Sequence, residues 1–124
     1  MRQTEEKTPL GSVHISPKAI ATIAYHALHQ TYGVVGLAPK NRLQALTRDP
    51  LQGIEVRYDG EGLEIEVYII VEYGTNLRAV ANSAANQVRY AVEKALGLPI
   101  KAVNVHIRGL RHSKSQEAAS EEEA

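Results

Sequence analysis

Three glutamates on one side of an alternating segment raise the first chemical question. Glu64, Glu66 and Glu72 are separated by even numbers of residues, so a strand would place their carboxylates on one face. Paired carboxylates perform acid–base chemistry when the surroundings raise the pKa of one and keep the other low. The neighbouring residues offer nothing that would separate the pKa values, so we interpret these glutamates as a solvated sheet surface.

Two histidines and three serines are the other candidates for chemistry. His26 and His29 lie three residues apart in a helical segment, where neighbouring rings could together bind a metal ion. The same helix face offers no carboxylate as a third ligand, so we predict solvated histidines and no metal. No nucleophile elbow or base motif accompanies the serines, which are Ser12, Ser16 and Ser83. We therefore expect no cofactor and no enzymatic activity.

A small basic cluster occurs in the least regular internal stretch, residues 39–52. Lys40, Arg42 and Arg48 lie close together there, beside Asn41 and Gln44. Such cations could contact phosphates of a lipid, a nucleic acid or a nucleotide. The competing interpretation is that three loop cations are simply solvated, and we keep them as the candidate anion contact.

An aromatic and an aliphatic residue stand on the otherwise polar side of the same alternating segment. Tyr68 and Ile70 are flanked by glutamates, and an apolar spot within a charged rim is a common composition of protein contacts. Coverage by the 39–52 loop, by the acidic tail or through a strand twist is the alternative. In a symmetric contact, arginines could meet the glutamates. The predicted contact residues are Arg57, Glu64, Glu66, Tyr68, Ile70 and Arg108.

Composition limits the class of protein. The chain has 124 residues, no cysteine, and 14 basic against 14 acidic side chains. A single domain without disulfides follows from the length and the missing cysteines. A neutral chain lacks the basic footprint of a dedicated nucleic-acid binder. No apolar run is long enough to span a bilayer and the first residues lack a signal-peptide core, so we expect a cytoplasmic protein without direct membrane insertion.

Apolar periodicity predicts the elements that position these residues. Helices begin at Ser16-Pro17 and at Thr75-Asn76, where the polar side chains can cap them, and they end at Gly33 and Gly97. One or two further turns of helix are expected around Leu43 and Leu46. Alternating or β-branched runs predict strands over residues 11–15, 34–37, 54–58, 63–72 and 102–107.

The resulting order, β-α-β-β-β-α-β, indicates an α+β fold. A single mixed or antiparallel sheet with both helices packed on one face would bury every apolar stripe. We expect one domain over residues 9–110. The polar segments at either end, residues 1–8 and the acidic 111–124, are expected to be disordered because they have little apolar surface to bury.

Short motifs occur in a fixed order along residues 11–110. They are Gly11-x-Val13-x-Ile15-Ser16, Gly33-Val34-x-Gly36, Tyr73-Gly74 with Leu77 and Val80, Val88 with Val92, Gly97-Leu98, Val103-Asn104-Val105 and Gly109. This order resembles the alkaline shock protein family, the Gls-type envelope stress proteins of Gram-positive and related bacteria. The resemblance implies a small, non-enzymatic, cytoplasmic protein of cell-envelope homeostasis that forms homo-oligomers and is held at the membrane by an anchored partner.

The leading hypothesis is therefore a self-associating interaction module that docks on a membrane-anchored protein. The alternative is a small RNA-binding α+β domain. Such domains use a GxxG loop between helices or exposed aromatic residues on the sheet. The loop is missing here and Tyr68 is the one well-placed sheet aromatic, so the sequence disfavours a nucleic-acid partner.

Overall fold

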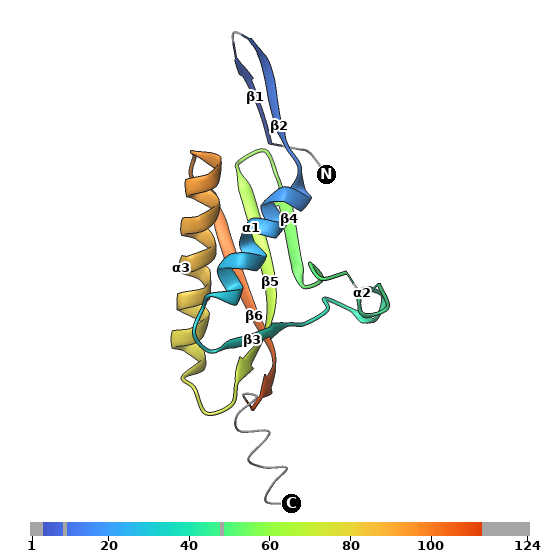
Figure 1. Ribbon diagram of the computed structural model, residues 1–124, viewed down its shortest axis with the longest axis vertical. Coiled ribbons are helices and arrows are strands. Elements are labelled where there is room, and N and C mark those ends of the chain that lie inside the picture. The colour runs from blue at the N-terminus through green and yellow to red at the C-terminus, as the bar shows by residue number, and fades with distance from the viewer. Residues whose placement is uncertain (1–3, 9, 48, 113–124) are drawn as a thin grey trace, which may run out of the picture.

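The computed structural model describes residues 4–8, 10–47 and 49–112 (Figure 1). Within these residues the chain forms six strands and three helices. In chain order they are β1 (Thr4–Thr8), β2 (Gly11–Ile15), α1 (Pro17–His29), β3 (Val34–Leu37), α2 (Arg42–Ala45), β4 (Ile54–Tyr58), β5 (Leu63–Glu72), α3 (Leu77–Leu96) and β6 (Ala102–Arg111).

Strand β5 is the centre of a four-stranded mixed sheet. On one side it pairs in parallel with β6, from Glu64↔Ala102 to Glu72↔Arg111. On the other side β4 runs antiparallel along its first half and β3 along its second half. A parallel pair needs a crossover connection, which α3 provides between β5 and β6. The α+β class and the open sheet predicted from the sequence are confirmed.

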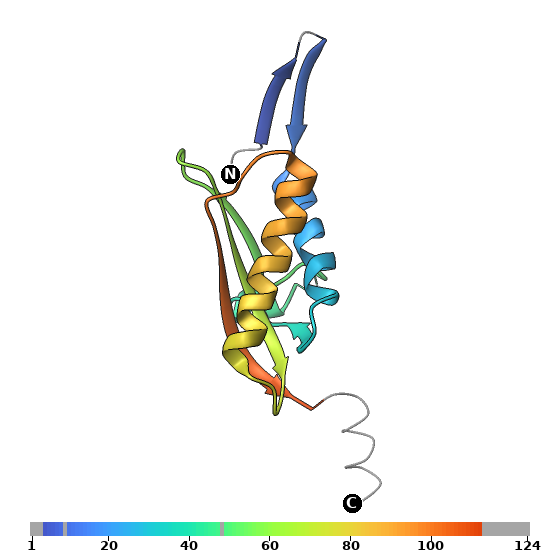
Figure 2. The same ribbon diagram turned by 90° about the vertical axis from the view of Figure 1, so that its left-hand side faces the viewer.

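Helices α1 and α3 pack on the same face of this sheet and leave the other face open (Figures 1 and 2). The hydroxyl of Ser16 accepts a hydrogen bond from the amide of Ala19, at 3.2 Å, and Pro17 occupies the first helical position of α1. The side-chain oxygen of Asn76 accepts from the amide of Ala79, at 3.0 Å, at the start of α3. Both caps satisfy amides that the helices leave without partners.

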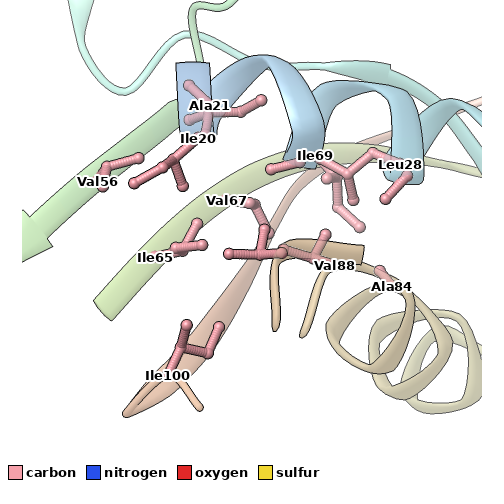
Figure 3. Packing of buried hydrophobic residues seen from close by; sticks show 14 of the residues in the cluster. Ile20, Ala21, Leu28, Val56, Ile65, Val67, Ile69, Ala84, Val88 and Ile100 are labelled. Carbon is pink, nitrogen blue, oxygen red and sulfur yellow. The ribbon is translucent and has the colours of Figure 1, made fainter. Parts of the chain in front are cut away.

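The core fills the space between the helices and the sheet (Figure 3). From β5, Ile65, Val67, Ile69 and Val71 are completely buried. Each large aliphatic side chain removed from water contributes about 1.5–3 kcal/mol. The helices meet this row with a complementary stripe that includes small side chains, namely Ile20, Ala24, Leu28, Val80, Ala84, Val88 and Val92. Small residues let both helices lie close to the sheet.

The N-terminal segment differs from the prediction. The sequence predicts disorder for residues 1–8, of which 1–3 lie outside the described residues, and a strand of the main sheet for residues 11–15. Instead β1 and β2 pair antiparallel, from Thr4↔Ile15 to Thr8↔Gly11, as a separate two-stranded sheet (Figure 1). A hairpin needs backbone pairing but no buried face, so the polar sequence of β1 does not prevent it. Most of β2 is exposed, and Ile15 alone reaches the edge of the core.

Residues 39–52 form an arm that projects from the sheet edge between β3 and β4 (Figure 1). Both ends of the arm bind one residue of β5. The amide of Ala38 donates to the carbonyl of Tyr68 at 2.9 Å, and the amide of Tyr68 donates to the carbonyl of Gly53 at 2.8 Å. The short helix predicted in this stretch is present as α2, and its Leu43 and Leu46 side chains are 77% and 80% exposed.

The C-terminal boundary of the domain also shifts slightly. The sequence predicts that the disordered tail begins at Arg111, but this residue is the last of β6. Its carbonyl accepts a hydrogen bond from the amide of Tyr73 at 2.8 Å, and the ring of His112 lies 5.0 Å from that of Tyr73. The backbone therefore stays in the sheet past Leu110. The remainder of the expected tail, residues 113–124, lies outside the described residues.

The base of the arm requires a glycine, which a matched pair of variants can test. Gly53 and Gly60 share a positive φ, at +88° and +87°. A Cβ on Gly53 would lie 2.4 Å from the carbonyl oxygen of Ala38, whereas a Cβ on Gly60 would meet nothing within 4 Å. Gly60→Ala should lower the free energy of unfolding by about 1 kcal/mol through backbone strain alone. Gly53→Ala should lower it by about 3 kcal/mol or more in urea denaturation. Equal losses would show that the base of the arm relaxes freely.

Candidate functional site on the open sheet face

Charged side chains from three strands form a connected layer on the open face. Arg57 of β4 is central to it. Its guanidinium lies 3.4 Å from Glu55, 3.2 Å from Glu64 and 3.5 Å from Glu66. Alternation along each strand directs these side chains away from the core, and the β4–β5 register places Arg57 directly opposite Glu64. The layer is therefore fixed by the strand pairing.

Strand β6 extends this layer with a side-chain amide and an imidazole. The amide nitrogen of Asn104 donates to Glu64 at 2.9 Å and also to Glu66. His106 lies 2.9 Å from the other carboxylate oxygen of Glu66 through its Nε2. Glu66 is thus surrounded by partners and only 7% exposed, which is unusual for a glutamate. Complete pairing is what makes such burial tolerable.

Burial and pairing have opposite effects on the pKa of Glu66. Burial raises it, whereas the hydrogen bonds from Asn104 and His106 and the charge of Arg57 lower it. The partners prevail, so the pKa lies below the ordinary value of 4.5. A carboxyl group held in its charged form serves as an anchor for its partners and is poorly suited to donate a proton at neutral pH.

The predicted apolar contact on this face is partly wrong, because Tyr68 is not exposed. Its side chain is only 6% exposed. The His106 ring stacks on it with centroids 4.5 Å apart and planes 13° apart, and the guanidinium carbon of Arg108 lies 4.9 Å from its centroid. Stacking and cation–π attraction both favour this arrangement. Ile70, the second member of the expected pair, is half-buried beside Gly109.

Of the basic cluster, the structure describes Lys40 and Arg42. Lys40 forms an ion pair with Glu55 at the edge of the charged layer, and that hydrogen bond and charge raise the pKa of Lys40. Arg42 begins α2 on the exposed arm, and Arg48 lies outside the described residues. The candidate anion contact therefore rests on Arg42 and on a lysine that is already paired.

The remaining candidates have the following partners in the described part of the chain. Ser12 Oγ and His14 Nε2 are hydrogen-bonded at 2.9 Å. Tyr25 lies edge-on to both His26 and His29, with ring centroids 5.5 Å and 4.3 Å away. No group of three or more His, Cys, Asp or Glu residues is placed to hold a metal there. Ser16 is occupied as a helix cap. A shallow depression on the open face is lined by Arg57, Tyr58, Asp59 and Glu64, which form the outer end of the charged layer.

Sequence reasoning missed Asn104 and His106 as members of the site. Both are on the outward side of a predicted strand, so their face could be foreseen. Their contacts depend on the parallel pairing of β5 with β6, which puts Asn104 next to Glu66 and His106 next to Tyr68. Single-sequence periodicity does not reveal which strands are neighbours. If the register were known, an uncharged hydrogen-bonding residue opposite a glutamate would have indicated these contacts.

The lowered pKa of Glu66 predicts how stability depends on pH. A depressed pKa in the folded state contributes stability above the unfolded pKa of about 4.5, and this contribution is lost as the pH falls through the folded value. Glu66→Gln should therefore show a shallower loss of unfolding free energy below pH 4.5 than the native protein. At pH 7 it should be less stable by about 1–3 kcal/mol, because hydrogen bonds to a charged group are weakened.

Urea denaturation at a series of pH values measures both effects. Glu61→Gln is the matched control, since that side chain is 80% exposed in the β4–β5 turn. It should keep a pH profile close to that of the native protein. If Glu66→Gln and Glu61→Gln give the same profile, the carboxylate of Glu66 is not an anchor of the layer.

Comparisons with known proteins agree with this architecture. Residues 5–112 match the model of the alkaline shock protein family, which is described as having a cell envelope-related function. The uncharacterised protein YloU of Bacillus subtilis is 36% identical, over 86% of this chain and 94% of that protein. The uncharacterised protein YqhY of the same organism is 29% identical, over 99% of this chain and 95% of that protein.

A solved structure of a MamM C-terminal domain variant has a similar fold. It superimposes with a TM-score of 0.50 at 17% identity and covers 77% of this chain and 95% of that domain. At this identity the likeness concerns the fold alone. The family assignment rests on the sequence match, which spans the N-terminal hairpin, the sheet and both long helices. The resemblance seen in the short motifs is thereby confirmed, and the chain belongs to the alkaline shock protein family of cell envelope-related proteins.

Proposed function

We propose that this protein is a non-enzymatic interaction module of cell-envelope homeostasis that self-associates and docks on a membrane-anchored partner protein. The observation that carries the proposal is the charged layer on the open sheet face. Its carboxylates and cations are already paired with one another, so the layer presents a fixed pattern of charge. A fixed pattern favours recognition of another protein, because little side-chain order is lost on binding.

The composition of this face supports a protein contact over catalysis. Arg57 keeps about half of its side chain exposed, and Arg108 is exposed above the ring of Tyr68. Half-buried Ile70 adds an apolar spot beside them. Arginines beside an aliphatic residue within a polar rim are typical of interface composition.

The RNA-binding alternative has less support. Proteins that bind single strands offer exposed aromatic rings on which bases stack. Tyr68 is the aromatic residue that could have served, and His106 stacks on its ring. The open face also carries Glu55, Glu64 and Glu66, whose charges would repel phosphates.

We place the protein in the cytoplasm, next to the membrane through its partner. In the part of the chain that the structure describes, no helix combines the length and apolar character needed to cross a bilayer. The cations of the arm could add weak attraction to lipid headgroups. Each is worth roughly 1 kcal/mol near an anionic surface, and the ion pair with Glu55 already occupies Lys40. Attraction of this size is too weak to hold a protein at a membrane without a partner.

The purified protein should therefore fail to sediment with anionic vesicles at physiological salt. Three cations would contribute about 3 kcal/mol at most, which corresponds to an affinity in the millimolar range. Phosphatidylglycerol vesicles and neutral phosphatidylcholine vesicles, compared in a co-sedimentation assay, provide the measurement. Strong sedimentation with the anionic vesicles alone, lost in the Arg42→Glu variant, would show that the arm binds lipid directly and that no anchored partner is needed.

Docking through the open face can be tested inside the cell that makes the protein. A fluorescent fusion of the native chain should lie at the cell periphery, and Ile70→Lys should become diffuse because it buries a charge in the contact. Leu46→Lys introduces the same charge on the arm, at a side chain that is 80% exposed, and serves as the control. Circular dichroism should be native for both variants. Diffuse Leu46→Lys with peripheral Ile70→Lys would place the contact on the arm and overturn the proposed face.

A further inference from the structure

Strand β6 forms one entire edge of the main sheet. In the described residues it pairs with β5 and with no other strand, so one side of its ten residues is open. Ile65 and Val67 of β5 turn their backbone groups away from β4 and toward β6, where they are aligned with Val103 and Val105. In a parallel ladder only one residue of each aligned pair points its backbone groups at the other strand, so those of Ala102, Asn104 and His106 face β5 and those of Val103, Val105 and Ile107 face outward.

This edge lacks the usual protection against pairing. Natural edge strands are short, interrupted, or marked with charged residues and proline. Residues 102–107 read Ala-Val-Asn-Val-His-Ile, with no lysine, arginine, acidic residue or proline and three β-branched side chains. Such a segment pairs readily with another strand.

The opposite edge of the sheet shows the contrast. It consists of β4 and β3, which have five and four residues and are separated by the projecting arm. Strand β4 also carries charged Glu55 and Arg57. One edge is thus interrupted and charged, and the other is continuous and uncharged over six residues. The difference makes β6 the edge of the sheet that is open to pairing with a further strand.

We propose that β6 pairs antiparallel with β6 of a second copy, around a two-fold axis at Val105, so that two sheets join into one. This inference rests on the proposed self-association and supplies its surface. Outward-facing residues must pair with each other, and the register centred on Val105 meets this requirement by placing Val103 opposite Ile107 of the second copy, twice. Asn104 then lies opposite His106 of the second copy.

Charge complementarity selects this register. It also brings Arg108, at the bulge that follows Ile107, next to Ala102 of the second copy. In each copy, Ala102 lies beside Glu64 in the β5–β6 ladder. The small alanine leaves space for the long arginine to approach that carboxylate on the same open face. A register centred on Asn104 would instead pair Ala102 with His106 and bring no cation to Glu64.

The joined sheet would keep the layers of the single domain. A two-fold axis perpendicular to the sheet puts all long helices on one side and both charged layers on the other. The open face proposed for docking would then be doubled, and its two halves would be continuous across the new β6–β6 pair. A partner with two binding segments would gain affinity from such a doubled surface.

Disulfide trapping tests the axis directly, because the native chain has no cysteine. At the two-fold axis, Val105 meets its own copy as a hydrogen-bonded pair, with Cα atoms about 5.5 Å apart, a separation that a disulfide can bridge. Val105→Cys should become mostly covalent dimer under mild oxidation. Tyr58→Cys, at 43% exposure on the opposite edge, is the control and should remain mostly monomeric although its thiol is more accessible.

Two substitutions of opposite charge at one position give a second measurement, which does not use disulfides. Ala102→Lys would face Arg108 of the second copy, and Ala102→Glu would attract it. Analytical ultracentrifugation should show at least a tenfold rise in the dimer dissociation constant for the lysine variant and no rise for the glutamate variant. Within one chain the lysine lies beside Glu64, so its fold should remain intact.

The outcomes separate this inference from the proposed function. A native protein that self-associates without trapping at Val105, or that responds equally to both charges at Ala102, overturns the β6 pairing and leaves self-association through another surface. A native protein that stays monomeric at all concentrations, with no trapping, overturns the pairing and the self-association together. The docking function would still be decided by the localisation of Ile70→Lys.

Discussion

Pairing along both edges of β5 is the constraint on which the structure depends. This strand contacts each of the other three strands of the main sheet, and its inward side chains, from Ile65 to Val71, form the completely buried centre of the core. Its outward side chains provide Glu64, Glu66 and Tyr68, around which the charged layer assembles. Core packing and surface recognition are therefore set by one register. A slip of one residue would exchange the two sets and destroy both.

Much of this fold could be predicted from the sequence, because each long element carries its own periodicity. The alternation of β5, the small-residue stripe of α3 and the Ser16-Pro17 start of α1 are local patterns. The hairpin of β1 and β2 was missed because β1 pairs through backbone groups and has no apolar alternation of its own. The end-to-end placement of β3 and β4 was missed for a related reason, since it depends on the register along β5.

The candidate site was predictable in its face but not in its contacts. Alternation alone assigns Arg57, Glu64 and Glu66 to the outward side, and the structure brings them together there. Whether Tyr68 is exposed depends on what β6 places over it, and the ring of His106 and the guanidinium of Arg108 cover it. These residues are separated from Tyr68 by the whole of α3 in the chain. Only the parallel crossover brings them together.

The way the arm is attached has a consequence for how the protein can vary. Its two ends, Ala38 and Gly53, are both hydrogen-bonded to the backbone of Tyr68, so the chain leaves the sheet and returns at nearly one point. Closing a longer loop between fixed ends costs little, about 0.6 kcal/mol for each doubling of length. Residues 39–52 can therefore be lengthened, shortened or replaced by a foreign peptide while the sheet remains intact. The arm is a natural place for insertion of a tag or a binding epitope.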